Sequence, residues 1–260
     1  MSGATVERAR LRRDWAVAAA AFVLALVALG AGVAALTGHP SAARWAVPAA
    51  GVAAFELWFL RRHLGANHAE GAAGRPYGSL GAANALTLVR GGAFAAVAGF
   101  AVVDPTTELA WLLAALYGGG CALDWIDGFA ARRAGRTTVL GARLDMAFDT
   151  LGFVVAPVVG VLWGRLPVWY LSLSLARYLF KAGRGLRRRR GRPVYDLPPS
   201  RVRRPLAGVQ MVFITLALAP VLPAGTVRAL AAVVLVPSLA VFARDYLVVA
   251  GYFRGRKRNA

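Results

Sequence analysis

The sequence predicts an all-α fold, a polytopic bundle of transmembrane helices, on the strength of three observations. The 260 residues are 58% hydrophobic with a mean hydropathy of +0.55, which is unusual for a soluble domain. Lys and Arg nevertheless outnumber Asp and Glu by 31 to 12, so the net charge is +19. The basic residues fall in short runs between apolar spans, as in the cytoplasmic loops of membrane proteins. This placement favours anionic lipid and phosphorylated compounds as partners and disfavours nucleic acid.

Eight apolar stretches are predicted to span the membrane, whose hydrocarbon core is about 30 Å thick. The connections between them alternate in charge: those at 61–75, 132–143 and 181–204 are basic, as are both termini, whereas the others carry few positive charges. This alternation predicts a multi-pass protein of the cell membrane with both termini in the cytoplasm. The predicted spans are residues 15–37, 46–60, 84–103, 109–131, 141–162, 168–180, 205–222 and 227–252.

The first two spans are predicted to form an N-terminal appendage. Residues 15–37 are uncharged and exceed the length of about 7–15 residues usual for the apolar part of a signal peptide, so we expect a retained helix. The second span contains Glu56, which is expected to reach the interface or to face another helix. A polar, Gly-rich connection at 63–80 follows, and it predicts an appendage at residues 1–78 and a core at 79–260.

The third and fourth spans open the core. Asn84, Thr87 and Arg90 recur at i, i+3 and i+6, near one face of the third span, a pattern that is by itself typical of a cap followed by a membrane anchor. The glycines 118–120 in the fourth span lack the Gly-Lys-Ser/Thr ending of a phosphate loop and predict close helix packing instead. Cys121 is the only cysteine, which excludes an intramolecular disulfide and a thiolate metal cluster.

Two pairs of carboxylates flank the short basic link after the fourth span. Asp124 and Asp127 are spaced i, i+3 at the end of that span, and Asp145 and Asp149 are spaced i, i+4 at the start of the fifth. Each pair therefore projects from one face of its helix, and an antiparallel helix pair would bring all four together at the cytoplasmic side. Carboxylates with few His or Cys neighbours suit Mg²⁺ or Mn²⁺.

Small and basic residues accompany the acidic faces. Gly128, Ala131 and Gly141 share those faces and leave room for a bulky ligand, while Arg132 and Arg136 add positive charge. In the alternative interpretation, the carboxylates only pair with neighbouring arginines as topology anchors, which would not explain the small residues or the convergence of two pairs. The pattern therefore predicts a site for divalent metal and phosphate.

Residues 124–149 read Asp-x2-Asp-Gly-x2-Ala-Arg-x8-Gly-x3-Asp-x3-Asp, which resembles the signature of the CDP-alcohol phosphotransferase family at all eight fixed positions. The run containing Asn84, Thr87 and Arg90 is a second, weaker point of similarity. The resemblance implies that the six spans after residue 78 form the family core and that the first two are an addition. It also suggests a homodimer.

The resemblance implies roles for the motif residues. Asp149 is expected to be the general base, and two Mg²⁺ or Mn²⁺ ions are expected at Asp124, Asp127, Asp145 and Asp149. The residues expected to contact nucleotide or phosphate are Gly128, Ala131, Arg132, Gly141, Asn84 and Thr87.

The implied reaction transfers a phosphatidyl group from a CDP-linked lipid, such as CDP-diacylglycerol, to a small alcohol and releases CMP. Arg177, Lys181 and Arg184 recur at i, i+4 and i+7, and they suggest an acceptor that bears a phosphate, with Arg201 and Arg203 behind them. These residues serve equally well as an anchor on anionic lipid. Two alternative functions stay open: a CDP-aminoalcohol phosphotransferase acting on diacylglycerol, and a cation transporter that uses intramembrane Asp residues.

Overall fold

The computed structural model describes residues 3–69, 76–134 and 138–252, without the side chains of residues 3–5, 8 and 126–134. The described residues form eight α-helices and three short 3₁₀ turns, with one isolated β-bridge and no strand, so the predicted all-α fold class is confirmed. The helices are α1 (Gly3–Thr37), α2 (His39–His63), α3 (Gly81–Gly99), α4 (Thr107–Ala134), α5 (Val139–Leu162), α6 (Ser172–Arg189), α7 (Arg203–Leu218) and α8 (Ala224–Val249).

Each predicted span corresponds to one of these helices, but the helices differ in length and polarity. In the described part of the chain, four segments are long and apolar enough to cross a membrane: Ala9–Thr37, Gly81–Val102, Val139–Leu162 and Ala224–Val249. The sixth span was predicted to end at Phe180, and the helix continues to Arg189. The predicted loop after that span therefore begins with two further basic helical turns.

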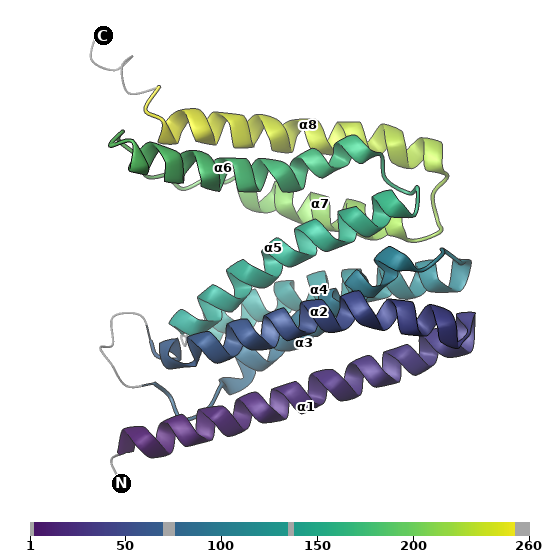
Figure 1. The fold of residues 1–260 in the computed structure, drawn as a ribbon. Coiled ribbons are helices and arrows are strands. Elements are labelled where there is room, and N and C mark those ends of the chain that lie inside the picture. Colours follow the sequence, from purple (N-terminus) through teal and green to yellow (C-terminus); the bar gives the residue numbers. More distant parts are fainter. Residues whose placement is uncertain (1–2, 70–75, 135–137, 253–260) are drawn as a thin grey trace.

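The helices form two groups, and α5 runs obliquely between them (Figure 1). Helices α1 to α4 lie together in one group, and α6 to α8 form the other. Helix α3 lies at the centre of the first group, and 61% of the residues in its 18-residue apolar stretch are buried. In α1 only 11% of the residues in the corresponding stretch are buried. Helix α1 therefore presents most of its surface outward, as a lipid-facing helix does.

The two N-terminal helices are joined by a tight turn. Gly38 has a φ of +87°, which is favourable only for glycine, and its amide donates a hydrogen bond to the Ala34 carbonyl at 2.8 Å. Pro40 then lies in the first turn of α2, where its missing N–H leaves no helical hydrogen bond unmade. Together these two residues reverse the chain and lay α2 beside α1.

Helix α2 is held on α3 by Trp45, which is 1% exposed. Its Nε1 atom donates a hydrogen bond to the Ala96 carbonyl at 3.1 Å. A Cβ atom on Gly99 would lie 2.4 Å from the Trp45 ring, so glycine is required at this crossing. The appended helices thus pack directly against the first helix of the predicted core.

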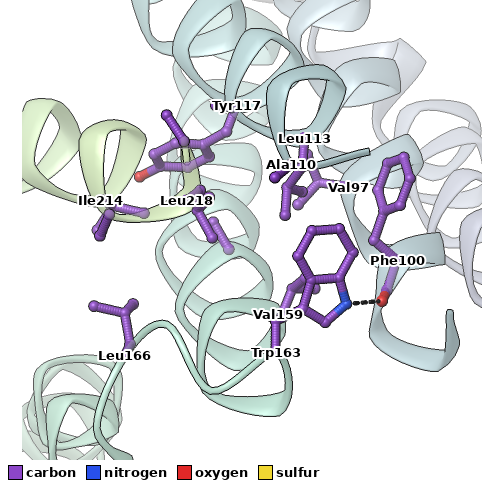
Figure 2. Close-up of a cluster of buried hydrophobic side chains, with 14 of the residues drawn as sticks. Val97, Phe100, Ala110, Leu113, Tyr117, Val159, Trp163, Leu166, Ile214 and Leu218 are labelled. Carbon is purple, nitrogen blue, oxygen red and sulfur yellow. Dashed lines mark hydrogen bonds between the residues drawn. The ribbon is translucent and has the colours of Figure 1, made fainter. Parts of the chain in front are cut away.

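The largest buried cluster lies where α3, α4, α5 and α7 meet (Figure 2). Trp163, just after α5, donates hydrogen bonds from Nε1 to the carbonyls of Phe100 and Val103, both at 2.9 Å. Close packing of the helices supports this cluster, because a Cβ atom on Gly120 would lie 2.7 Å from the Phe94 ring. Gly118 and Gly120 therefore contribute to helix packing, as the sequence predicts, whereas a Cβ atom on Gly119 would meet nothing within 4 Å.

Candidate active site

A single buried guanidinium joins acidic residues that come from two different helices. Arg90 of α3 is 1% exposed, and its Nη1 atom donates a hydrogen bond to Asp124 of α4. Its Nη2 atom lies 3.0 Å from Oδ1 of Asp145 and 3.3 Å from Oδ1 of Asp149, both in α5. Three helices therefore converge on one cation at the end of the bundle where α4 ends and α5 begins.

The carboxylates of this cluster are more accessible than the arginine that joins them. The side chains of Asp124, Asp145 and Asp149 are 33%, 50% and 32% exposed, compared with 2% for Arg90. Three carboxylates and one guanidinium carry a combined charge of minus two when all are ionised. The described cluster therefore combines a buried cation with excess negative charge on its accessible side.

Polar residues of α3 extend the cluster toward the start of α5. Thr87 donates a hydrogen bond from Oγ1 to Oδ1 of Asp145 at 3.2 Å. Asn84 donates to the Leu80 carbonyl at 2.7 Å, and a Cβ atom on Gly141 would lie 2.8 Å from Asn84 Oδ1. Asn84, Thr87 and Arg90 thus share one face of α3, as predicted, and Gly141 allows α5 to approach that face.

The start of α5 is fixed by a side-chain cap. Thr138 has an extended backbone conformation, and its Oγ1 atom accepts a hydrogen bond from the Gly141 amide at 2.9 Å. This cap sets where α5 begins and therefore sets the register that aims Asp145 and Asp149, one turn apart, at Arg90. The Thr138 cap and a β-bridge between Thr138 and Ala69 thus both hold the start of the helix that carries the second acidic pair.

Several predicted site residues lie outside the described side chains. Asp127, Gly128, Ala131 and Arg132 belong to α4, whose described backbone is helical from Thr107 to Ala134. The backbone therefore keeps Asp124 and Asp127 one helical turn apart, as the sequence predicts. Their expected contacts with metal, nucleotide and phosphate stay predictions.

The donor set can be compared with what a divalent cation requires. Among the described His, Cys, Asp and Glu residues, no group of three is arranged to hold one metal ion. Three carboxylates nevertheless meet at one guanidinium, and their oxygens are the hard donors that Mg²⁺ and Mn²⁺ prefer. The chemistry of these side chains therefore fits a divalent cation, and Arg90 supplies the positive charge in their present arrangement.

The four residues predicted to contact the acceptor are not gathered in one place. Arg177 lines a cavity of about 170 Å³ between α5, α6, α7 and α8, and it is close enough to Asp149 for their charges to interact. Lys181 lines a different groove, of about 510 Å³, between α2, α5 and α6. The Arg184 guanidinium lies over the Phe180 ring at 6.0 Å, and Arg201 is exposed before α7.

The same cavity is lined by Arg203, which the sequence groups with the predicted acceptor contacts, and by Asp245, to which the sequence gives no site role. Arg203 of α7 forms a salt bridge with Asp245 of α8 at 2.5 Å, and Arg244 approaches the other oxygen of Asp245 at 2.8 Å. Arg90 was likewise noted only as a member of a polar run. Lone charges inside apolar spans were the available signal, because such residues are rare in membrane helices unless they meet a partner.

The comparison with known families agrees with the motif. The family model for CDP-alcohol phosphatidyltransferase matches residues 80–243, which is more than half of the chain and includes every residue of the aspartate cluster. The chain therefore belongs to the CDP-alcohol phosphatidyltransferase family. Helices α1 and α2 precede the matched region.

Curated relatives cover a smaller part of the chain. Proteins of Mycobacterium bovis and of two Mycobacterium tuberculosis strains, all named provisionally as cardiolipin synthases, are 42% identical over 60 residues. This segment is 23% of the present chain and 29% of each relative, so the similarity is local. No solved structure matches the chain significantly.

Proposed function

We propose that this protein is a membrane enzyme of phospholipid synthesis that transfers a phosphatidyl group from a CDP-diacylglycerol-like donor to the hydroxyl of an alcohol, releasing CMP. The observation that carries the proposal is the convergence of Asp124, Asp145 and Asp149 on Arg90 in a chain of this family. In this reaction the acceptor oxygen forms a bond to the phosphorus distal to cytidine, and the bond from that phosphorus to the oxygen of CMP breaks.

Two divalent cations, Mg²⁺ or Mn²⁺, are assigned to Asp124, Asp127, Asp145 and Asp149. When bound, they would neutralise the negative charge that develops on the diphosphate during transfer. The aspartates would hold these cations through their carboxylate oxygens. The side chains of Asp124, Asp145 and Asp149 are partly exposed and therefore accessible to the cations. Gly128, Ala131 and Arg132 of α4 are assigned to the cytidine nucleotide and its phosphates.

The role of general base is assigned to Asp149. Its side chain is partly exposed and lies beside Asp145 and Arg90, so it is accessible to an incoming hydroxyl. An aspartate carboxylate can accept the hydroxyl proton as the oxygen attacks phosphorus. Gly141, Asn84 and Thr87 would position the nucleotide, although their contacts with one another also serve the packing of α3 on α5.

Two kinds of acceptor are supported by separate observations. Arg177 and Arg203 both line one cavity, and the charge of Arg177 also acts on Asp149, which favours a small alcohol bearing a phosphate. The local similarity to proteins named provisionally as cardiolipin synthases instead favours a phospholipid acceptor such as phosphatidylglycerol. Lys181, Arg184 and Arg201 are retained as weaker candidates for acceptor binding. A homodimer with its active sites facing the cytoplasm completes the proposal.

The deciding experiment measures CMP released by the purified protein in detergent with CDP-diacylglycerol and Mg²⁺. Glycerol 3-phosphate, inositol phosphate and phosphatidylglycerol are supplied as separate acceptors, with a chelator as control. CMP release that requires one acceptor and stops with chelator supports the proposal and identifies the acceptor. CMP release only when a CDP-aminoalcohol and diacylglycerol are supplied would support the alternative CDP-aminoalcohol phosphotransferase. Failure of the protein to bind CDP would contradict the proposal that it is an enzyme of this kind.

A further inference from the structure

Glu56 of α2 is a buried carboxylate outside the region matched by the family. It is 0% exposed, and neither of its oxygens has a hydrogen-bond partner among the described residues. An unpaired carboxylate in an apolar interior is unfavourable, and it is stabilised either by protonation or by a positive charge nearby.

The neighbourhood of Glu56 supplies that charge. A Cβ atom on Gly91 would lie 3.0 Å from Glu56 Oε2, which places the carboxylate against the backbone of α3 beside Arg90. The charges of Glu56 and Arg90 are close enough to interact. In the described structure, Nε of Arg90 also has no hydrogen-bond partner, although both of its Nη atoms contact aspartates. Arg90 therefore contacts the aspartate cluster and is also near Glu56.

A divalent cation would compete with Arg90 for the aspartates. The guanidinium contacts one oxygen each of Asp124, Asp145 and Asp149. A cation held by the same carboxylates would be repelled by a guanidinium in that position, strongly so in a poorly hydrated site. A second carboxylate that accepts the positive charge of Arg90 would therefore favour metal binding.

We propose that Glu56 is a positioning residue for Arg90, which accepts its guanidinium when a divalent cation binds the aspartates. This inference rests on the proposed function, since it assumes a metal at that cluster. The appended helix α2 then contributes a carboxylate to the catalytic site from outside the region matched by the family. Glu56 itself touches neither substrate nor metal.

The test measures Mn²⁺ binding to the full-length protein in detergent. Electron paramagnetic resonance reports the concentration of the free ion during the titration. Glu56→Gln removes the charge at nearly constant volume and should raise the Kd for Mn²⁺ by about tenfold, the scale of coupling between neighbouring groups. Glu56→Asp keeps the charge and should restore most of the affinity. Glu108→Gln is the matched control, because Glu108 is exposed at the start of α4, and it should leave the Kd unchanged.

A double variant separates positioning from a general effect of charge. In an Arg90→Gln background no guanidinium competes, so Glu56→Gln should no longer alter the Kd. An equal loss of affinity with and without Arg90 would overturn the proposal, because Glu56 would then act on the metal directly. An unchanged Kd in the single Glu56→Gln variant would also overturn it, and that measurement remains valid if the double variant does not fold.

The outcome is distinguishable from failure of the proposed reaction. Mn²⁺ binding that is lost in Asp145→Asn locates the metal at the cluster whether or not CMP is released. If such binding occurs without turnover, the proposed reaction fails and the effect of Glu56→Gln still decides the positioning role. If the wild-type protein binds no Mn²⁺, the positioning role is overturned, whereas CMP release then decides the reaction independently.

Discussion

Arg90 is the residue on which the candidate site depends, because its guanidinium contacts three described carboxylates at once. Burying a guanidinium is costly unless it is paired and hydrogen-bonded, and here both Nη atoms are used. The carboxylates depend on it in turn, since without it they would repel one another. This mutual dependence gives a prediction about stability that does not require turnover.

Arg90→Met should lower the free energy of unfolding by about 1–3 kcal/mol in the absence of divalent cation, because three partly exposed carboxylates lose the cation that they share. Mg²⁺ should restore part of this loss by binding the same aspartates. The measurement is thermal unfolding in detergent with chelator or Mg²⁺. Arg44→Met is the control, since the Arg44 pair with Asp104 is exposed and 3.7 Å long. A loss that Mg²⁺ does not reduce would contradict a metal role for the cluster.

Asp149→Asn should reduce the rate of CMP release by about 10²–10⁴-fold, the usual contribution of a general base. The substitution keeps the size of the side chain and removes its ability to accept the hydroxyl proton. The comparison is Asp104→Asn, whose side chain is 93% exposed in the connection before α4 and should leave the rate unchanged. A near-normal rate in Asp149→Asn would move the role of base to another group.

At the scale of the helices, the crossing of α2 and α3 is set by glycine. Gly99→Ala should destabilise the protein by about 1–3 kcal/mol, because the new Cβ atom would lie 2.4 Å from the Trp45 ring and 2.6 Å from its carbonyl oxygen. Gly51→Ala is the matched control, since no atom lies within 4 Å of the added Cβ. It should be neutral or stabilising, as alanine favours a helix. Equal melting temperatures for both variants would argue against tight docking of α2.

Most of the helical plan could be predicted from the sequence, because apolar length and charge between spans are local properties. The link around Thr138 and the periodicity of Asp145 and Asp149 determine α5 without reference to any other helix. The end of α6 was harder to predict. Low hydropathy predicts a loop for the basic residues up to Arg189. These residues nevertheless continue α6, because that stretch contains no proline to end the helix.

The partners of buried charges could not be predicted, because pairing across helices depends on rotation about each axis. The alternatives for Glu56 were the interface or another helix, and the structure places it against α3. Asp245 and Arg203 are far apart in sequence and meet only because α7 and α8 pack side by side. Conversely, Arg177 and Lys181 share a helical face in sequence but line different cavities, because α6 passes between two neighbours.

At the scale of the whole molecule, α5 links the two helix groups (Figure 1) and carries two of the cluster's aspartates. The C-terminal end of α5 leads to Trp163 in the main hydrophobic cluster. Helix α7 packs closely on α4 at Gly118, where an added Cβ atom would lie 2.7 Å from Thr215. The groups are therefore joined by packing at one end, whereas the charged site lies toward the other end, where it joins α5 to α3 and α4. The charged end should be the one that faces water-soluble nucleotide and metal.

The orientation of the protein in the membrane follows from this placement and gives the last prediction. The basic end of α6 and the link between α4 and α5 should lie in the cytoplasm, and the connection before α4 should lie outside. In a Cys121→Ala background, which removes the single native cysteine, Arg188→Cys should react with a membrane-impermeant maleimide only after cells are opened. Glu108→Cys, at the exposed start of α4, should react in intact cells. The reverse pattern would place the aspartate cluster outside the cell, away from the CDP-linked donor, and would contradict both the topology and the proposed reaction.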